Sequence, residues 1–180
     1  MTDRRERRKL THVSRGGRPR MVDVSEKPVT ARRAVAEAFV TLGQETLTAI
    51  IDGQTTKGDV LTVAEMAGVM GAKRTAELIP LCHPIPLTDV VVEITPERPA
   101  GGVRVRATAA TTAATGVEME ALTAAAVAAL TVYDMVKGID RGAAIRDIQL
   151  LEKSGGRSGE WRRPAAGQAP TRRGSGRRRA

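Results

Sequence analysis

Aromatic residues are nearly missing from this sequence of 180 residues. Phe, Tyr and Trp occur once each, whereas 41% of the residues are hydrophobic. The core must therefore be built from Ala, Val, Leu, Ile and Met. The shortage also argues against the binding of single-stranded nucleic acids, because proteins of that class stack bases on aromatic side chains.

Cysteine and long apolar runs are equally scarce. Cys82 is the only cysteine, so no disulfide can form within the chain. No run of about 18 apolar residues is present, which predicts no membrane-spanning helix. The first residues are charged rather than apolar, unlike those of a signal peptide. Together these features predict a reduced, cytoplasmic protein.

The net charge of +9 is unevenly distributed along the chain. Residues 1–20 hold eight Lys or Arg against two acids, and residues 154–180 hold eight Arg against one acid. Residues 21–153 therefore carry a net negative charge. A nucleic-acid-binding domain would present a basic face of its own, so we do not expect nucleic acid to be a partner of this central region.

Composition divides the chain into three parts. Residues 1–18 have the character of a flexible basic arm. Residues 161–180 are rich in Arg, Gly and Pro and lack the apolar residues that a core requires, which predicts a disordered tail. Between them we expect one folded domain over residues 19–160, a usual length for a single domain.

The first half of this domain is predicted to be mainly helical. Residues 20–24 are typical of a short strand. Apolar residues at helical spacing follow Thr30, an expected N-cap, and predict a helix that reaches Ile51. A second helix is predicted over residues 62–78. The residues expected on one face of that helix are Val63, Ala64, Ala67 and Met70.

The second half alternates between strand and helix. Apolar and polar residues alternate over 89–95 and 103–109, which predicts an antiparallel hairpin. Residues 120–136 predict a helix that is apolar on nearly every side and therefore buried, in part against another subunit. A last strand is expected over 144–152. This order predicts an α+β fold, a ferredoxin-like sandwich with a mostly antiparallel sheet and helices packed on one face.

Two places on the chain are candidates for acid–base chemistry. Asp134 and Lys137 stand three residues apart on a nearly uncharged helix and share one of its sides. A surface ion pair is the simpler interpretation of that spacing. Lys57 precedes Gly58 between two predicted helices, where it is either an anion-binding residue or an ordinary surface lysine.

His83 and Cys82 lie in a loop that Pro80 and Pro84 make rigid. Histidine is suited to proton transfer near neutral pH, but a structural hydrogen bond explains His83 equally well. Cys82 is most simply a small buried hydrophobe. We expect no metal site here, because other ligands at zinc spacing are missing.

Two acids and a lysine flank the predicted helix over 120–136. Glu118 and Glu120 either complement the helix dipole or bind a ligand, and Glu120 is able to accept hydrogen bonds from a guanine-like amidine edge. Lys153 precedes two glycines, where it either holds phosphate or marks a flexible end of the domain. These residues indicate an anionic ligand and name no substrate.

Longer blocks of sequence are far more specific than these single residues. They are LTHV at 10–13, MVDVSEK at 21–27, AEAFVTL at 36–42, TLTAIIDGQTTKGDV at 46–60, AGVMGAKRTAELIPLCHP at 67–84, TGVEMEALTAAAVAALTVYDMVKGID at 115–140 and LLEKSGGRSG at 150–159. Together they resemble the cyclic pyranopterin monophosphate synthase family, the accessory protein C of molybdenum-cofactor biosynthesis. The resemblance spans about residues 10–160 and is loose only over 88–102.

The resemblance implies an activity and an assembly. Members of that family are lyases that convert (8S)-3′,8-cyclo-7,8-dihydroguanosine 5′-triphosphate into cyclic pyranopterin monophosphate and diphosphate. The resemblance also implies a ferredoxin-like α+β fold and a cytoplasmic homohexamer, a trimer of dimers with active sites at the dimer interfaces. No cofactor is implied, although Mg²⁺ can accompany the triphosphate.

The same resemblance assigns roles to matching residues. Asp134, Lys57 and Lys137 are expected to be catalytic. The residues expected to bind the substrate are Leu81, Cys82, His83, Glu118, Met119 and Glu120. The residues expected near the triphosphate are Lys153, Lys27, Arg32, Lys73 and Arg74.

Two other interpretations of the chain stay open. A nucleic-acid-binding module that uses the basic ends predicts salt-dependent binding that is lost with residues 162–180. A scaffold that keeps the pocket without turnover is the other. The full set of charged candidates argues against it, because a decayed enzyme often lacks one of them.

Overall fold

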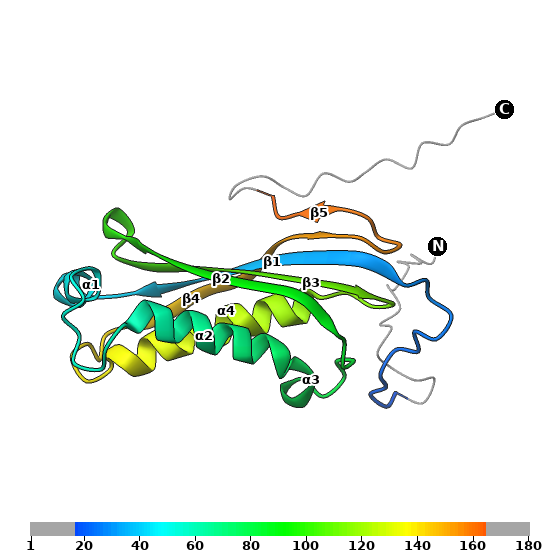
Figure 1. Cartoon of the computed structure of the whole chain (residues 1–180), viewed down its shortest axis with the longest axis horizontal. Coiled ribbons are helices and arrows are strands. Elements are labelled where there is room, and N and C mark those ends of the chain that lie inside the picture. Colours follow the sequence, from blue (N-terminus) through cyan, green and yellow to red (C-terminus); the bar gives the residue numbers. More distant parts are fainter. Residues whose placement is uncertain (1–16, 165–180) are drawn as a thin grey trace, which may run out of the picture.

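A five-stranded antiparallel sheet forms the frame of the described part of the chain (Figure 1). The computed structural model describes residues 17–164. In chain order the elements are β1 (Thr30–Thr41), α1 (Gln44–Ile51), α2 (Val60–Lys73), α3 (Thr75–Leu78), β2 (Leu87–Glu97), the 3₁₀ turn η1 (Arg98–Ala100), β3 (Gly102–Ala113), α4 (Glu118–Val136), β4 (Ala144–Ser154) and β5 (Trp161–Arg162).

The strand order β2-β3-β1-β4-β5 places β1 at the centre of the sheet. β1 pairs with β3 on one side and with β4 on the other, and both pairings are antiparallel. The chain leaves β1 through helices and returns as β2, with β3 lying between these two strands. This split β-α-β arrangement, repeated through α4 into β4, confirms the α+β prediction with helices packed on one face.

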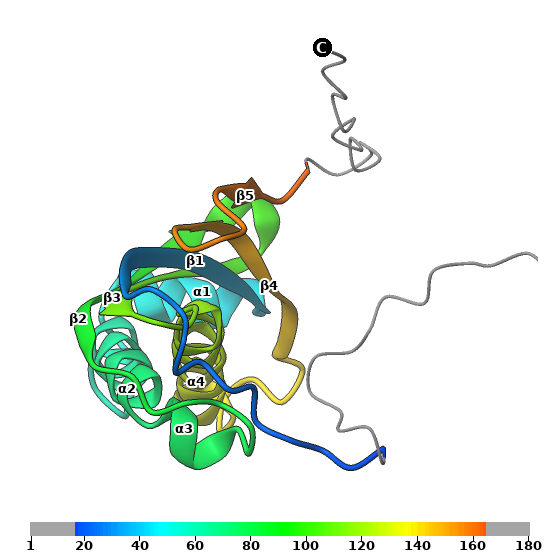
Figure 2. The same ribbon diagram turned by 90° about the vertical axis from the view of Figure 1, so that its right-hand side faces the viewer.

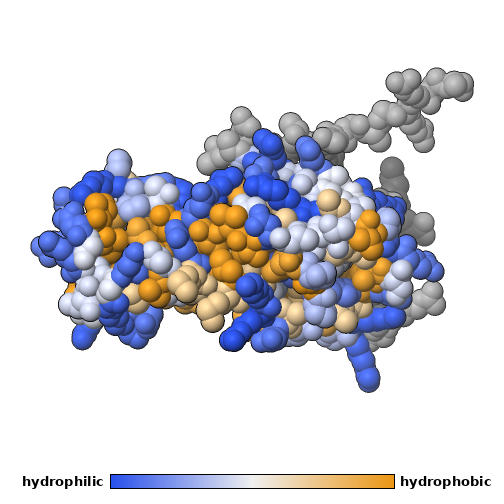
Figure 3. Space-filling model, in the orientation of Figure 1, coloured by the Kyte–Doolittle hydropathy of each residue, from blue (hydrophilic) through white to orange (hydrophobic). Residues whose placement is uncertain are grey.

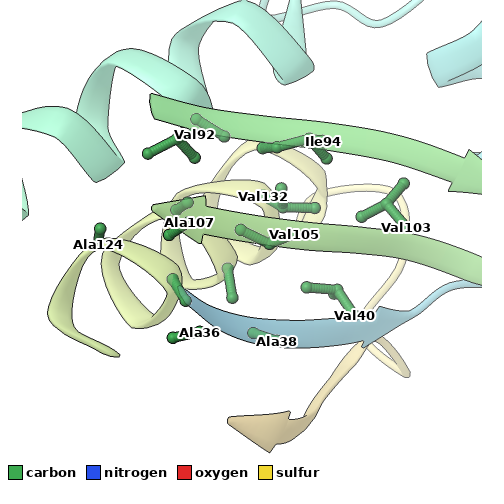
Figure 4. Close-up of a cluster of buried hydrophobic side chains, with 14 of the residues drawn as sticks. Ala36, Ala38, Val40, Val92, Ile94, Val103, Val105, Ala107, Ala124 and Val132 are labelled. Atoms are coloured by element: carbon green, nitrogen blue, oxygen red, sulfur yellow. The ribbon is translucent and has the colours of Figure 1, made fainter. Parts of the chain in front are cut away.

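The core lies between this sheet and two helices. Figure 2 shows α2 and α4 side by side on one side of the sheet. Alternate residues of β1 and β3 point toward the helices and are fully buried, as Figure 4 shows for Ala36, Ala38, Val103 and Val105. Small side chains bring the layers close together, so the core needs almost no aromatic residues.

Glycines on α2 set its distance from α4. A Cβ atom at Gly71 would lie 2.8 Å from Cγ2 of Val127, closer than side chains approach in folded proteins. A Cβ atom at Gly68 would lie 3.0 Å from the carbonyl oxygen of Ala124. The two helices therefore pack at a separation that only glycine permits, and this contact fixes α4 relative to the loops that follow α2.

The prediction for residues 20–51 is partly wrong. Residues 20–24 form no strand, and β1 occupies Thr30–Thr41, where a helix was expected. Only Gln44–Ile51 is helical. The segment AVAEAFV at 34–40 satisfies both helical and alternating spacing, and its Val and Phe residues suit a strand. Hydrogen-bonded pairing with β3 on one side and β4 on the other favours the strand over the helix.

The predictions for the other elements are largely confirmed. The hairpin, the long helix and the last strand lie where they were expected. The second helix is shorter, because α2 ends at Lys73 and α3 forms a separate turn. Its expected face is also incorrect: Val63 and Met70 are 42% and 54% exposed, whereas Ala64 is buried against α4.

Helix α4 is long and apolar enough to cross a membrane by length and composition alone. Half of its apolar window is buried inside the protein, where the helix contacts α2 and the strands of the sheet. Within residues 17–164 it is the one helix that meets this criterion. Its partners identify it as the core helix of the domain.

The predicted arm at 1–18 and the predicted tail at 161–180 lie largely outside the described residues. Trp161 and Arg162 are described, and they pair with Lys153 and Glu152 as β5. The sheet therefore continues beyond β4 by this short edge strand.

Candidate functional site

Three predicted catalytic residues meet at the C-terminal end of α4, and we call them the Asp134 group. Lys137 Nζ donates to Asp134 Oδ1 at 2.6 Å. Lys57 Nζ donates to the backbone carbonyl of Asp134 at 2.8 Å and lies 3.4 Å from Oδ2. The three side chains stay about half exposed, with 44–57% of their surface open to solvent. The structure thus joins Lys57 to a pair that lies 77 residues away in sequence.

A tight turn before α2 positions Lys57. The hydroxyl of Thr55 donates to the carbonyl of Gly58, and the N–H of Gly58 donates back to Thr55 at 3.2 Å. Gly58 has a φ of 91°, a left-handed conformation that favours glycine. Asp59 then caps α2 by accepting from the N–H groups of Leu61 and Thr62. These bonds fix the loop from which the lysine extends.

The hydrogen bonds of the Asp134 group determine the protonation states of Asp134 and Lys137. The hydrogen bond from Lys137, and to a smaller extent the one from Lys57, lowers the pKa of Asp134. This carboxyl is therefore ionised. The hydrogen bond from Asp134 in turn raises the pKa of Lys137, so this lysine is protonated. The arrangement supplies two ammonium donors beside a carboxylate. The raised pKa keeps Lys137 protonated and makes it a weaker acid than an ordinary lysine.

A cavity of about 720 Å³ lies at the other end of α4, and we call it the Cys82 cavity. Its lining residues come from the segment before β1, from the loop after α3, from the segment between β3 and α4, from the start of α4 and from the end of β4. They are Val22, Lys27, Ile79, Leu81, Cys82, His83, Thr115, Gly116, Glu118, Met119 and Lys153. Seven of these are predicted site residues, so the structure brings together most of the predicted substrate-binding set.

Cys82 and Glu120 form a hydrogen-bonded pair at the edge of this cavity. Cys82 Sγ donates to Glu120 Oε1 at 3.6 Å. Burial, followed by the nearby Glu120, raises the pKa of the Cys82 thiol to about 11. Burial also raises the pKa of Glu120, whose side chain is 3% exposed and whose Oε2 has no hydrogen-bond partner in the described chain. A thiol with such a pKa is a poor nucleophile at neutral pH.

Among the described residues, the side chains of His83 and Lys153 each make one hydrogen bond. His83 Nε2 donates to the carbonyl of Val22 at 2.7 Å, because a carbonyl only accepts. This bond ties the segment before β1 to the wall of the cavity. Lys153 Nζ donates to Glu118 Oε1 at 2.7 Å, which links the end of β4 to the start of α4. The Glu118 carboxylate folds back over Gly116 so closely that a Cβ atom there would collide with it.

A second cleft of about 630 Å³ adjoins the Cys82 cavity, and we call it the Lys27 cleft. Its lining is Glu26, Lys27, Pro28, Arg32, Ala114, Thr115, Arg157 and Ser158. Lys27 and Thr115 line both hollows. Three cations against one acid give the cleft a positive character that suits an anion.

Glu120, Lys73 and Arg74 lie outside the Cys82 cavity. Glu120 lies behind Cys82 and, with Lys73, lines a separate hollow of about 350 Å³. Arg74 is exposed at the C-terminal end of α2. The structure therefore does not bring Lys73 and Arg74 to Lys27, Arg32 and Lys153.

The Asp134 group and the Cys82 cavity stand far apart in one chain. Glu118 begins α4, and Asp134 follows 16 residues later on the same helix. At about 1.5 Å of rise per residue these two side chains are separated by roughly 24 Å along the axis. A single chain thus presents the predicted residues as two groups rather than as one site.

Some residues that line the Cys82 cavity or the Lys27 cleft were not predicted from the sequence. Val22 contributes a backbone carbonyl, and Ile79 contributes an apolar wall. These two residues, like Thr115 and Arg157, lie in the blocks that carried the resemblance, but no role was assigned to any of them. In the described range 17–164, no three His, Cys, Asp or Glu side chains gather as a metal ion would require.

A family model and several known proteins match most of the chain. The model of the MoaC family matches residues 21–156. A cyclic pyranopterin monophosphate synthase of Thermomicrobium roseum is 59% identical over 154 residues, which cover 86% of this chain and 93% of that protein. Enzymes of the same name from Cereibacter sphaeroides KD131 and Brucella ovis are 58% and 55% identical; the matches cover 84% and 85% of this chain and 96% and 93% of those proteins.

Proposed function

The chain belongs to the MoaC family, and we infer that it has the cyclic pyranopterin monophosphate synthase activity after which its relatives are named. It is accordingly a lyase of molybdenum-cofactor biosynthesis. We propose as its substrate the cyclised guanosine triphosphate that the resemblance implies, and as its products cyclic pyranopterin monophosphate and diphosphate.

The Cys82 cavity is the main observation that supports this proposal. Its volume of about 720 Å³ lies in the range of small-molecule sites, and its lining combines apolar walls with few polar groups. Leu81 and Met119 supply apolar surface for the ring system. The Glu118 carboxylate lines the cavity and is able to accept hydrogen bonds from an amidine edge. Glu120, held behind Cys82, is placed to orient the thiol rather than to contact the ring.

The Asp134 group is the proposed source of acid–base chemistry. The reaction opens a ring, closes a pterin ring and closes a cyclic phosphate, so several protons must move. We propose that Lys57 or Lys137 acts as a general acid or base and that Asp134 orients it. General acid–base catalysis of this kind contributes about 10²- to 10⁴-fold to a rate.

A second copy of the chain is needed to complete the site. The ring system of the substrate cannot touch two groups that stand roughly 24 Å apart on one helix. A two-fold axis across paired copies would bring the Asp134 group of one copy to the Cys82 cavity of the other, and would do so twice. We propose that the active site is shared in this way.

Exposed apolar side chains support self-association. On α2, Met66 and Met70 are 63% and 54% exposed, and Leu130 of α4 is 58% exposed. Figure 3 shows apolar side chains gathered across the middle of the face that carries β2 and α2. Patches of this kind mark interaction surfaces. We propose the homohexamer, a trimer of dimers, that the resemblance implies.

A cytoplasmic location completes the proposal. Cys82 is a free thiol, and proteins of oxidising compartments more often pair their cysteines. The substrate is a nucleotide derivative of intracellular metabolism. Mg²⁺ is a companion of the triphosphate in this proposal rather than a resident metal of the protein.

The test is turnover by the purified protein. We expect cyclic pyranopterin monophosphate and diphosphate to be released together in equal amounts, and Asp134→Ala to abolish both. Tight binding of the cyclised nucleotide without product release would instead favour a scaffold. Absence of both binding and release would contradict the proposal and favour a role for the basic ends in nucleic-acid binding.

A further inference from the structure

Two segments of the chain carry the Asp134 group, and a side chain outside the group joins them. Lys57 lies on the loop that follows α1, whereas Asp134 and Lys137 lie at the end of α4. In the loop after α4, Asp140 Oδ2 accepts from the N–H of Gly43 at 2.7 Å. Gly43 is the residue from which α1 begins. Asp140 therefore connects the segment that carries Lys57 to the segment that carries Lys137.

Helix α1 has no cap of its own, and Asp140 takes that place. Gly43 stands at the N-cap position, and no side chain makes a capping hydrogen bond there. A carboxylate at a helix N-terminus is favoured by the helix dipole. A Cβ atom at Gly43 would lie 3.3 Å from Asp140 Oδ2, so the two segments meet closely. Within residues 17–164 Asp140 forms no ion pair, so its carboxylate binds backbone N–H groups rather than a cation.

The path from Asp140 back to Lys137 is short and hydrogen-bonded. The N–H of Asp140 donates to the carbonyl of Val136 at 2.9 Å, and the N–H of Lys137 donates to the carbonyl of Tyr133 at 2.9 Å. Asp140 Oδ1 accepts from the N–H of Gly142 at 3.1 Å, which closes the turn after α4. The Asp140 carboxylate is therefore fixed relative to the last turn of α4.

The path from Gly43 to Lys57 is also closed by backbone bonds. The N–H of Leu47 donates to the carbonyl of Gly43 at 2.9 Å, and beyond α1 the N–H of Gln54 donates to the carbonyl of Ala49 at 2.8 Å. The tight turn before α2 then presents the lysine. Leu47 is buried and holds α1 on the core, but apolar burial is not directional. The bond to Asp140 is what fixes the beginning of α1.

We propose that Asp140 is a positioning residue of the Asp134 group: it holds α1 against the end of α4 and thereby keeps the Lys57 ammonium on Asp134. That turnover needs this geometry rests on the proposed function. Lys57 Nζ lies 2.8 Å from the carbonyl of Asp134 and 3.4 Å from Oδ2, contacts that a shift of about 1 Å would break. A misplacement of that size costs about 100-fold in rate.

Carbodiimide crosslinking tests this geometry without any turnover, because the reagent joins an amine to a carboxylate only where the two are in contact. Mass spectrometry of the wild-type peptides should find Lys57 joined to Asp134, and Asp140→Ala should lose most of this product. Lys153 and Glu118, 2.7 Å apart at the other end of α4, provide the internal control and should crosslink equally in both proteins. Asp52→Ala removes an exposed carboxyl from the other end of α1 and should keep both products.

A second substitution separates positioning from stability. Asp140→Ala removes the carboxylate at the start of α1, so its melting temperature should fall by a few degrees. Adding Gly43→Ser gives α1 a cap of its own, and the described atoms within 4 Å of the new Cβ belong to the deleted carboxyl. The double variant should regain the melting temperature but not the crosslink. Its kcat should stay about tenfold to 100-fold low with KM unchanged, because the Cys82 cavity is intact.

Three outcomes would overturn the proposal. A crosslink and a kcat that return with the melting temperature in the double variant would show that Asp140 only stabilises α1. Wild-type crosslinking and kcat in Asp140→Ala would show that packing alone places Lys57, and a wild type without the crosslink would contradict the contact itself. A wild type whose crosslink depends on Asp140 but which converts no cyclised nucleotide would contradict the proposed function and leave the role of Asp140 standing.

Discussion

At the scale of residues, the two ends of α4 differ in how they hold charge. Asp134 is ionised and exposed between two lysines, whereas Glu120 is buried with its Oε2 unpaired. The former arrangement keeps Lys137 protonated at an exposed position that a ligand can reach. The latter disfavours ionisation, so Glu120 contributes shape and hydrogen bonding rather than charge.

Glu120 should make stability depend on pH. Burial raises its pKa in the folded protein, so the native state binds this proton more tightly than the unfolded state does. The stabilisation is complete below the unfolded pKa and is lost as the pH rises through the folded pKa. Relative to Glu120→Gln, which cannot ionise, the wild type should therefore lose melting temperature as the pH rises above the ordinary carboxyl pKa of 4.5.

Thermal unfolding at several pH values measures this difference. The exposed Glu77→Gln is the matched control and should show no such pH-dependent gap. A constant gap between wild type and Glu120→Gln over the whole range would mean that Glu120 ionises as freely in the folded protein as in the unfolded chain.

Asp134→Asn should separate catalysis from stability. The substitution preserves shape but removes the charge that holds both lysines, so we expect turnover to fall by about 100-fold or more. The side chain is 57% exposed, so the melting temperature should stay unchanged. Asp52→Asn, at the exposed end of α1, is the control for turnover. Unchanged turnover by Asp134→Asn would remove the Asp134 group from the mechanism.

Most residues that line the Cys82 cavity could be predicted from the sequence, because long matching blocks locate them. What the blocks could not show is which atoms face a ligand. His83 turns its Nε2 to the carbonyl of Val22, and Glu120 lies behind Cys82. Such orientations depend on segments that only tertiary packing brings together.

At the scale of elements, the contact between α2 and α4 should be intolerant of added volume. Gly71→Ala would place a methyl group 2.8 Å from Val127, and we expect it to lower the free energy of unfolding by about 1–3 kcal/mol. Gly138→Ala, which meets nothing within 4 Å, should be nearly neutral. Urea denaturation of both variants checks this; equal stabilities would show that the helices separate freely.

The one large error in secondary structure also belongs to this scale. Residues 34–40 were predicted to be helical because their apolar residues fit that spacing, but β1 is hydrogen-bonded on both sides by strands that come about 60 to 120 residues later. The hairpin of β2 and β3 was predicted correctly, since both strands and the turn between them are adjacent in sequence. Sequence patterns thus predicted the pairing of strands that are adjacent in sequence. They failed for the central strand β1, whose partners are distant in sequence.

At the scale of the whole molecule, the separation of the two groups follows from helix length. Glu118 and Asp134 stand at the two ends of one long helix, and the rise per residue alone sets their distance at roughly 24 Å. The fold adds that Lys57 joins one end and Lys153 the other. Light scattering should accordingly give a mass that is a multiple of the 19.1 kDa chain, six-fold for the proposed hexamer.

The most direct test of the shared site is complementation between two inactive variants. Asp134→Ala disables the acid–base group, and Lys153→Ala disables the cavity, so each protein alone should be inactive. In a refolded equal mixture, half of the dimers pair one chain of each kind, and each such dimer has one site built from two intact halves. We predict about one quarter of wild-type turnover for the mixture. A mixture as inactive as its components would contradict the shared site and place all catalytic residues of each site in a single chain.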